Sequence, residues 1–364
     1  MSSQKQDQSQ YTWRNKMTYT KNYNLPKLGR EAEIRLKTAK KAALKIGFAT
    51  IKSKEIKPEF KAEELEEFLE HVKKLPFESV NNDELIRQRC VGYASMYAIN
   101  NLLYFLYPEY DPKNGHFIQN YNLPSDVNPD FKNTNGAKPR NYMALDPMLV
   151  ANKALHKIIH IGYMMSPLPE QFENKPMEVE IQFIKYVPRQ GEDAVPTPTI
   201  VHQDQDWAFC VFLITRENVE GGKNSFVKKE HVGKELHEVP TDDILQQCTF
   251  TELFDGVSVD DQKIGHHVDA VSLKHGEHIG ERTILILSYK PLVPSRPELY
   301  AKPSLDEKTT ENKNSNPEEK EIINNISNAS KAINLTIEAI SKLAEEIEEE
   351  EEIKPTYLKH NYWF

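Results

Sequence analysis

The chain has few cysteines, no long apolar run and no excess of positive charge, and each shortage excludes a class of protein. Its three cysteines form no Cys-x-x-Cys pair, so neither a disulfide framework nor a cysteine zinc site is expected. No stretch approaches about eighteen apolar residues, so no membrane span is expected. The net charge of −9 argues against a nucleic-acid partner. The N-terminus lacks the apolar core of a signal peptide, so we expect a cytoplasmic protein.

Composition divides the chain into a central domain with two polar ends. Residues 1–28 are rich in Gln, Ser, Asn and Lys, which is typical of a disordered segment. Residues 303–317 have the composition of a linker. Residues 318–364 combine a near-heptad apolar stripe with an acidic run and an aromatic tail, which predicts a helix. We expect one domain over 29–302, and a C-terminal helix that docks on it, forms a homo-oligomer or binds another partner.

Helices are expected in the first half of the domain and strands in the second. Apolar residues at helical spacing predict helices over 30–45, 58–74 and 146–160, with a further helix from about residue 82 through Tyr93. Alternating or continuous apolar residues predict strands over 177–186, 207–214, 264–273 and 282–289. This order predicts an α+β fold in which N-terminal helices buttress a β-sandwich or barrel core.

A short motif before the second of these strands carries the first chemical signal. His202 and Asp204 are two residues apart, so on an extended strand both side chains would leave the same face. An imidazole beside a carboxylate supplies two of the three ligands of a 2-His-1-carboxylate iron site. Alone, the pair can equally be a surface His and Asp at a strand end. Asn218, Gly221 and Gly222 then provide a turn that allows positive φ.

The remaining parts of such a site follow downstream. His266 lies on an expected strand and is a candidate third ligand. Three facial ligands leave positions for a keto acid and for O2. Arg282 begins the last apolar strand, and its guanidinium could pair bidentately with the far carboxylate of 2-oxoglutarate, although it could also be a surface residue.

A second imidazole, His267, leaves an alternative open. Adjacent strand residues face opposite ways, so only one of His266 and His267 could reach a shared metal, and we expect it to be His266. A zinc site that adds His275 and His278 is the competing interpretation. It would leave the His202-x-Asp204 pair and Arg282 unexplained.

Taken together, these residues give the chain a pattern that resembles a known family. The pattern is His-x-Asp, Arg-x-Asn-Val-x-Gly-Gly, Asp-Asp-x-x-x-x-His and Gly-x-Arg, beginning here at His202, Arg216, Asp260 and Gly280. It is similar to the bacterial 2-oxoglutarate-Fe dioxygenases of the L-isoleucine dioxygenase type. Those enzymes hydroxylate free L-amino acids on a double-stranded β-helix, a jelly-roll or cupin-like core.

The resemblance implies an enzyme that uses Fe(2+), 2-oxoglutarate and O2 to hydroxylate a small substrate, here a free L-amino acid. It implies that His202, Asp204 and His266 hold the iron. It also implies that Arg282, helped by Thr283, holds 2-oxoglutarate.

The substrate and its binding residues are less constrained by the pattern. Arg87, Arg140 and Tyr142 are candidates for binding a substrate carboxylate, as is Arg89 beside Arg87. One alternative is a hydroxylase of protein side chains, which would need an open groove. Another is a non-catalytic jelly-roll module that binds partners through its C-terminal helix, although the presence of both histidines, the aspartate and the arginine argues against it.

Overall fold

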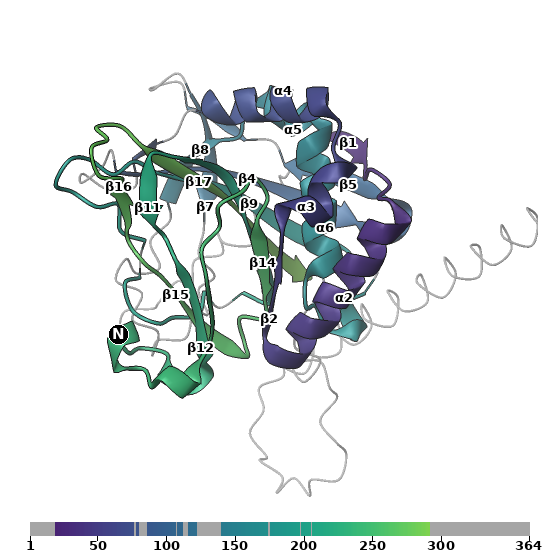
Figure 1. The fold of residues 1–364 in the computed structure, drawn as a ribbon. Helices are drawn as coiled ribbons and strands as arrows, with labels where there is room; N and C mark the ends of the chain where they lie inside the picture. The colour runs from purple at the N-terminus through teal and green to yellow at the C-terminus, as the bar shows by residue number, and fades with distance from the viewer. Residues whose placement is uncertain are drawn as a thin grey trace, which may run out of the picture. The chain divides into compact units, whose positions relative to one another are not determined.

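The structure is a computed structural model that describes residues 19–75, 78–79, 86–106, 108–111, 116–121, 140–173, 175–196, 198–204 and 206–291 (Figure 1). All of these residues belong to one compact unit, Met1–Ser295. The predicted linker at 303–317 and the predicted helix and tail at 318–364 lie outside the described residues, as does 1–18 of the predicted disordered segment.

The strands alternate with helices in the first half of the chain and dominate the second half. They are β1 (Tyr19–Asn24), β2 (Phe48–Ile51), β3 (Glu78–Ser79), β4 (Arg87–Tyr97), β5 (Leu102–Leu106), β6 (Glu109–Asp111), β7 (His116–Tyr121), β8 (Arg140–Ala144), β9 (Met177–Tyr186), β10 (Ala208–Glu217), β11 (Val219–Gly221), β12 (Asn224–Lys228), β13 (Ile244–Cys248), β14 (Gly256–Val259), β15 (Ile264–Val268), β16 (Val271–Leu273) and β17 (Glu281–Pro291).

The helices agree largely with the helical periodicity of the sequence. The α-helices are α2 (Arg30–Ile46), α3 (Ser53–Ile56), α4 (Ala62–Lys73), α5 (Pro147–Ala151) and α6 (Lys153–Met165). The 3-10 turns are η2 (Lys57–Glu59), η3 (Ala98–Asn100), η4 (Glu170–Phe172), η5 (Lys229–His231), η6 (Leu236–Glu238) and η7 (Thr241–Asp243). The predicted helix over 146–160 is two helices, because Asn152 ends α5 and its side chain caps Ala154 of α6. Within the described residues, no helix is long and apolar enough to cross a membrane.

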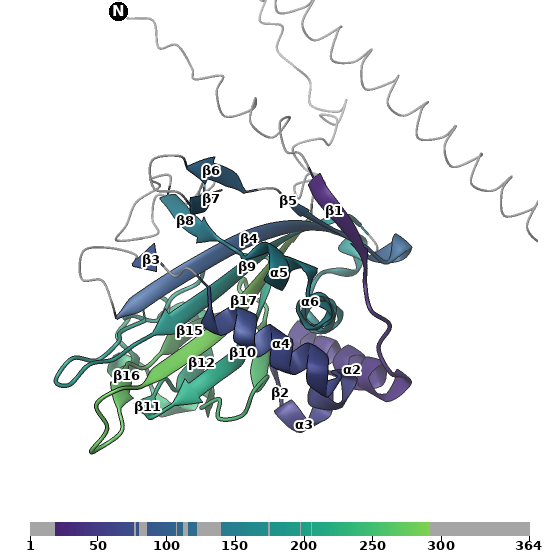
Figure 2. The same cartoon turned by 90° about the horizontal axis from the view of Figure 1, so that it is seen from above.

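A large, mostly antiparallel sheet faces smaller sheets. Over the described residues the large sheet has twelve strands, with the main order β2-β14-β10-β17-β9-β4-β8-β7-β6, and only β4 and β8 pair in parallel. The smaller sheets are β13-β12-β15 and β11-β16. Figure 1 shows the helices along one face of the large sheet and the smaller sheets on its other side, and Figure 2 shows the long strands β4, β9 and β17 crossing the unit.

Two apolar cores fill the spaces on the two sides of the large sheet. The helix-side core packs the helices, for example Leu36 and Phe68, against the strands. The inner core joins the large sheet to the smaller sheets, as where Phe226 of β12 stacks on Phe48 of β2 with ring centroids 4.7 Å apart. Strand β10 contributes alternate residues to both cores, which confirms the strand that the continuous apolar run at 207–214 predicted.

Two expectations for the N-terminal half were wrong. The segment with Arg87, Arg89 and Tyr93 is strand β4, not a helix, and it pairs with β9 over its whole length. The predicted disordered segment 1–28 ends inside the packed unit, because β1 pairs with β5 and both Leu25 and Leu28 are buried in the helix-side core.

Candidate metal centre

Two histidines and one aspartate converge where the loop before β10 meets strand β15. His202 Nε2 lies 3.8 Å from Asp204 Oδ1, and His266 Nε2 lies 3.4 Å from Asp204 Oδ2. One ligand atom from each of the three side chains lies within 4.8 Å of the others. Over the residues that the structure describes, no other group of His, Cys, Asp and Glu side chains is arranged to hold a metal. The three predicted ligands are therefore brought together.

The backbone that holds the group differs from the sequence expectation. His202 and Asp204 lie in the loop before β10, not on a strand, so they do not share a strand face. An isolated β-bridge fixes this loop instead, since His202 and His266 exchange backbone hydrogen bonds of 2.9 Å. The ring of Phe209, at the start of β10, lies 5.3 Å from the His266 ring and closes one side of the group.

Each imidazole turns its Nε2 towards Asp204 and its Nδ1 towards an acceptor. His202 Nδ1 lies 2.9 Å from the carbonyl oxygen of Ile200, which it can reach as an N–H donor. His266 Nδ1 lies 3.6 Å from Asp261 Oδ1. An acceptor at Nδ1 leaves the Nε2 lone pair free, which is the usual arrangement around a metal-binding histidine.

The protonation of the group is set by burial and by mutual charge. Burial, with His266 adding to it, lowers the pKa of His202 to about 4, so this imidazole is neutral at pH 7. Burial also opposes ionisation of Asp204, but the hydrogen bond from His266 and the charges of both histidines and Arg89 outweigh it and lower the pKa of Asp204. For His266 burial is again opposed, and the carboxylates of Asp204 and Asp261 raise the pKa. The group thus offers one neutral imidazole and one carboxylate without any proton loss at neutral pH.

Two further aspartates beside the group were not predicted from the sequence. Asp261 is fully buried, and burial together with the Asp204 charge raises its pKa to about 7. Asp206 accepts a hydrogen bond of 2.6 Å from Ser288, and Lys290 lies 3.7 Å from it. The alternation of Asp204 with Asp206 and the paired aspartates at 260–261 were the available signals, but neither indicates which carboxyl groups become buried.

Arg282 is a buried cation on the inner face of β17. Its residue surface is 1% exposed, and its Nε and Nη1 atoms make no hydrogen bond with any described residue. The guanidinium lies over the Tyr186 ring, 5.7 Å from the centroid, and burial lowers its pKa to about 10. At that pKa it stays charged at neutral pH. A buried charge with unused donors is costly unless an anion completes it.

Thr283 does not share this position. Successive strand residues face opposite ways, so Thr283 leaves the sheet on the helix side, as Leu285 and Leu287 do. Its hydroxyl is buried without a hydrogen-bond partner among the described residues. Ile284 and Ile286 do share the face of Arg282 and supply an apolar wall in the inner core.

The predicted substrate residues lie on β4 and β8. Arg89 packs on Tyr142, with its Cζ 5.3 Å from the ring centroid and its Nη1 3.3 Å from the hydroxyl oxygen. Arg87 also lies over the Tyr186 ring, with its Cζ 5.9 Å from the ring centroid. The side chain of Arg140 lies outside the part of the chain whose side chains are described.

The other histidines near the group have separate surroundings. His267 turns away from the group and lies 3.4 Å from Asp269. His275 and His278 lie in the loop between β16 and β17 and belong to no metal-capable group within the described residues. The competing histidine zinc site is therefore not formed there.

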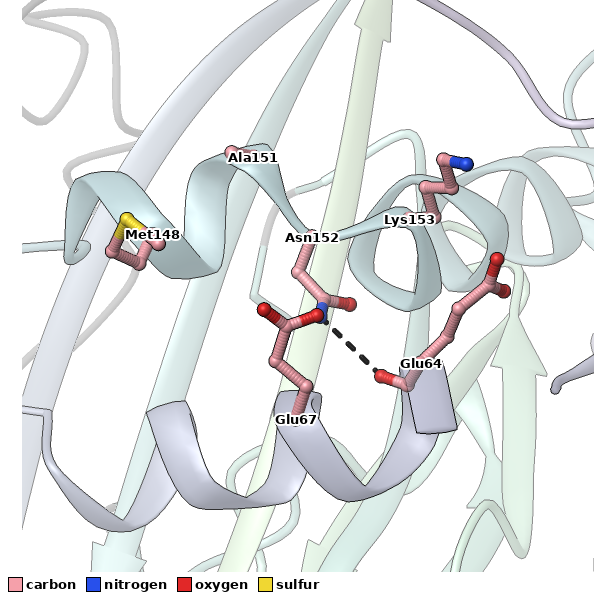
Figure 3. Close-up of a pocket in the computed structure, with 6 residues that line it drawn as sticks. All are labelled: Glu64, Glu67, Met148, Ala151, Asn152 and Lys153. Carbon is pink, nitrogen blue, oxygen red and sulfur yellow. Dashed lines mark hydrogen bonds between the residues drawn. The ribbon is translucent and has the colours of Figure 1, made fainter. Parts of the chain in front are cut away.

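A separate pocket of about 230 Å³ lies among the helices (Figure 3). It is lined by Glu64, Glu67, Met148, Ala151, Asn152 and Lys153. Figure 3 shows Asn152 reaching between the two glutamates, with its amide 3.3 Å from the Glu64 carbonyl oxygen. This contact joins α4 to the start of α6. The pocket is therefore a gap between packed helices, on the opposite side of the large sheet from His202, Asp204 and His266.

Comparison with known proteins assigns a class to this fold and site. A model of the 2OG-Fe dioxygenase family matches residues 104–288, just over half of the chain. The chain therefore belongs to the 2OG-Fe dioxygenase family, whose members are Fe(II)- and 2-oxoglutarate-dependent dioxygenases. Among curated protein sequences, none matches this chain.

Solved structures share the fold at low sequence identity. IDO from Bacillus thuringiensis is 13% identical with a TM-score of 0.51, over 71% of this chain and 96% of its own. A bsmA homolog from Methylobium petroleophilum is 15% identical with a TM-score of 0.54, over 72% and 95%. The Fe(II)/α-ketoglutarate-dependent dioxygenase TqaL is 10% identical with a TM-score of 0.54, over 72% and 90%.

The residues present fit the two groups that the family uses. Two imidazole nitrogens and a carboxylate converge within 4.8 Å, which is the donor set of a facial iron site. The unpaired donors of buried Arg282 suit a carboxylate.

Proposed function

We propose that this chain hydroxylates a small carboxylate-bearing substrate, a free L-amino acid, with its iron held by His202, Asp204 and His266. The observation that carries the proposal is the common orientation of the two imidazoles. Both Nε2 atoms face Asp204, at 3.8 and 3.4 Å, while both Nδ1 atoms face an acceptor. Histidines that only hydrogen-bond with the nearby carboxylate would not both need the second partner.

In this proposal Arg282 holds the far carboxylate of 2-oxoglutarate. Its buried guanidinium has free donors, and Ile284 and Ile286 lie along the same face of β17 between it and Ser288. Ser288 in turn contacts Asp206, two residues after Asp204. A dicarboxylate could thus extend along an apolar wall from Arg282 towards the metal group. Thr283 has no part in this arrangement because it faces the helix side.

The substrate's carboxylate is assigned to Arg89, steadied by Tyr142. The charge of Arg89 acts on Asp204, and its Nε is buried without a hydrogen-bond partner among the described residues. The Tyr142 ring and hydroxyl hold the guanidinium in one orientation. A free amino acid is favoured by the motif pattern shared with L-isoleucine dioxygenases.

We also assign the core to the double-stranded β-helix, or jelly roll, that the motif pattern implies. The support is an inner core closed between a large antiparallel sheet and the smaller sheets, with the candidate metal group inside it. The family's structures with TM-scores above 0.5 are consistent with this arrangement.

When bound, iron and 2-oxoglutarate together use O2 to convert a substrate C–H bond to C–OH while 2-oxoglutarate becomes succinate and CO2. The protein's part is to place and to shield. The neutral His202 and the ionised Asp204 are ready ligands at pH 7, while the carboxylates of Asp204 and Asp261 raise the pKa of His266 and so favour its protonated form. Arg282 and Arg89 fix two carboxylates, and the isoleucines of β17 keep water from the space between.

The test is succinate production from Fe(II) and 2-oxoglutarate with a panel of free L-amino acids. At least one amino acid should stimulate succinate production. Its product should be heavier by one oxygen atom, about 16 mass units. His202→Ala and His266→Ala should each abolish metal binding and turnover, because a facial site that loses a ligand loses most of its affinity. His267→Ala is the matched control and should retain both, since His267 contacts Asp269 instead.

Other results would redirect the proposal. Turnover of a peptide but of no amino acid would favour a hydroxylase of protein side chains. Full metal binding by His202→Ala and His266→Ala would remove the site altogether and favour a non-catalytic module. Loss of metal binding in His267→Ala alone would mean that the neighbouring imidazole is the ligand.

A further inference from the structure

The two histidines of the candidate centre are oriented by acceptors of different charge. His202 Nδ1 faces a neutral backbone carbonyl, that of Ile200, at 2.9 Å. His266 Nδ1 faces a carboxylate oxygen of Asp261 at 3.6 Å. The difference matters because a carboxylate draws the N–H proton more strongly than a carbonyl does and makes the imidazole a stronger donor to a metal.

The atoms that face each other at 3.6 Å are both without a partner. His266 Nδ1 and Asp261 Oδ1 are buried, and neither makes a hydrogen bond with any residue that the structure describes. The Asp261 side chain is completely buried, so water does not reach it. The distance of 3.6 Å to His266 Nδ1 is too long for a hydrogen bond. Burying a carboxyl oxygen without a hydrogen-bond partner is unfavourable, so the position of this oxygen needs a functional explanation.

Asp261 is also fixed to the loop that carries the other two ligands. Its Oδ2 accepts the backbone N–H of Asp206 at 3.2 Å. Its carbonyl oxygen accepts a hydrogen bond from the side chain of Gln203. The free oxygen is therefore held in place opposite His266 by contacts to both sides of Asp204, and it cannot turn to solvent.

We propose that Asp261 is the positioning residue for His266. In the metal-bound chain its carboxylate accepts a hydrogen bond from Nδ1–H, at a closer approach than the present 3.6 Å, which fixes the tautomer with a free Nε2 lone pair and aims that lone pair at the metal. The inference rests on the proposed function, because His266 needs such a partner only if it is a metal ligand. Asp261 itself touches neither metal nor substrate in this role.

A second carboxylate next in the chain supplies a matched control. Asp260 is also buried, at 8% exposure, but its carboxylate lies 3.2 Å from Lys263 and accepts the Gln262 backbone N–H at 3.3 Å. It makes no contact with His266. Replacing either aspartate by asparagine exchanges a carboxyl group for an amide in the same turn, so a specific role of Asp261 is what separates the two variants.

The experiment measures metal affinity without turnover, by Co(II) titration of the full chain against a competing chelator. Asp261→Asn should lower the affinity by roughly 10–100-fold, the usual effect of losing a histidine's outer partner. It should also alter the ligand-field absorption of bound Co(II). Asp260→Asn should leave both unchanged, and the thermal midpoint of metal-free Asp261→Asn should not fall below that of wild type. An Asp261→Asn affinity within about threefold of wild type would overturn the inference.

A measurement on wild type covers the case in which Asp261→Asn does not fold. In ¹⁵N-histidine spectra of the Zn(II)-loaded chain, His266 should be bound through Nε2 with a downfield Nδ1–H proton. Binding of His266 through Nδ1 would overturn the inference. Failure of the proposed function is distinguishable, because then His202→Ala would bind Co(II) as tightly as wild type, whereas failure of this inference alone leaves His202→Ala defective.

Discussion

Arg282 is a buried cation with hydrogen-bond donors that no described residue accepts. A fully buried guanidinium with two unpaired nitrogens destabilises the fold unless a ligand supplies the missing hydrogen-bond acceptors and negative charge. Two neighbouring cations each have at least one partner, since Arg216 donates to the Gly221 carbonyl oxygen at 2.9 Å and Lys185 pairs with Glu281 at 3.3 Å. This leaves Arg282 as the strongest cation for the far carboxylate of 2-oxoglutarate.

We predict that Arg282→Lys raises the apparent 2-oxoglutarate constant roughly 10–100-fold. Lysine keeps the charge but loses the bidentate fork, and a charge-assisted pair contributes about 1.5–3 kcal/mol, with about 1.4 kcal/mol for each factor of ten. Arg282→Ala should weaken binding further. Titration of succinate production with 2-oxoglutarate measures this, and Co(II) affinity should not change. Arg216→Lys, directly opposite on β10, is the control and should behave as wild type. An unchanged constant in Arg282→Ala would assign the cosubstrate to another cation.

Glu180 shows the opposite situation, a buried acid that ionises reluctantly. Burial, aided by the nearby Asp206, raises its pKa to about 7 against the opposing charge of Lys290. An acid whose pKa is raised in the folded state is destabilising when ionised. The penalty is absent below the unfolded pKa of about 4.3, grows as pH rises, and is complete above the folded pKa.

Glu180→Gln should therefore gain stability over wild type as pH rises. Between pH 5 and pH 8 the difference in free energy of unfolding should shift by about 2–3 kcal/mol in favour of the variant. Urea unfolding of the metal-free chains at both pH values measures the shift. Glu178→Gln, two residues earlier on the same strand but only partly buried, should show little pH dependence. Parallel curves for wild type and Glu180→Gln would mean that the Lys290 pair holds the carboxylate ionised without penalty.

At the scale of elements, the sequence predicted four strands with apolar residues at strand spacing but missed others, among them the short apolar β14 and the polar-faced β4. β9, β10, β15 and β17 have apolar residues at strand spacing, and all four were predicted. β4 was mistaken for a helix because its inner face carries Arg87 and Arg89, while its helix-side face uses Cys90 and Gly92. The arginines place polar side chains on the inner face of β4, so no apolar alternation marked the strand. Gly92 is small because a Cβ there would lie 2.5 Å from the Leu145 side chain.

The candidate site residues could be named from the sequence, but their geometry could not be predicted from it. The two histidines, Asp204 and Arg282 have chemistry that ordinary packing does not require, so a motif reveals them. Their meeting depends on a long-range bridge between His202 and His266, and on the loop at 200–206, which local periodicity does not encode. The burial of Asp261 likewise depends on residues 55 positions away, as its contact with Asp206 shows.

The turn between β11 and β12 is an element on which Arg282 depends. Gly222 has φ +64°, and a Cβ added there would lie 3.3 Å from the Arg282 guanidinium. We predict that Gly222→Ala lowers the free energy of unfolding by about 1–2 kcal/mol through its left-handed backbone and also raises the 2-oxoglutarate constant several-fold. Gly276→Ala has the same kind of strain, at φ +87°, with nothing within 4 Å of the added Cβ. It should lose stability alone, and equal 2-oxoglutarate constants in the two variants would contradict the prediction.

At the scale of the whole molecule, the two cores differ in the side chains that lie beside them. The helix-side core is apolar, and its side of the sheet carries the helices α2 to α6. The inner core surrounds the metal group and carries the buried Arg282 and the polar residues around Asp206. Changes on the helix side should therefore alter stability before they alter metal binding. The N-terminal boundary gives a way to test this separation, because β1, Leu25 and Leu28 belong to the helix-side core alone.

We predict that a chain of residues 19–302 binds metal with the affinity of the full chain, while a chain of residues 29–302 binds it equally well but is less stable. The shorter chain loses β1 from the edge of β5 and exposes the cavity left by Leu25 and Leu28. Burial of two leucines contributes about 1.5–3 kcal/mol each, so the free energy of unfolding should fall by about 3–6 kcal/mol. Urea unfolding of both metal-free chains gives the stability, and Co(II) titration at low temperature, where both are folded, gives the affinity.

Equal stabilities would mean that β1 adds nothing to the fold. Loss of metal binding in 19–302 would mean that residues 1–18 or 303–364 help to complete the centre, which the position of all three proposed ligands between residues 202 and 266 argues against.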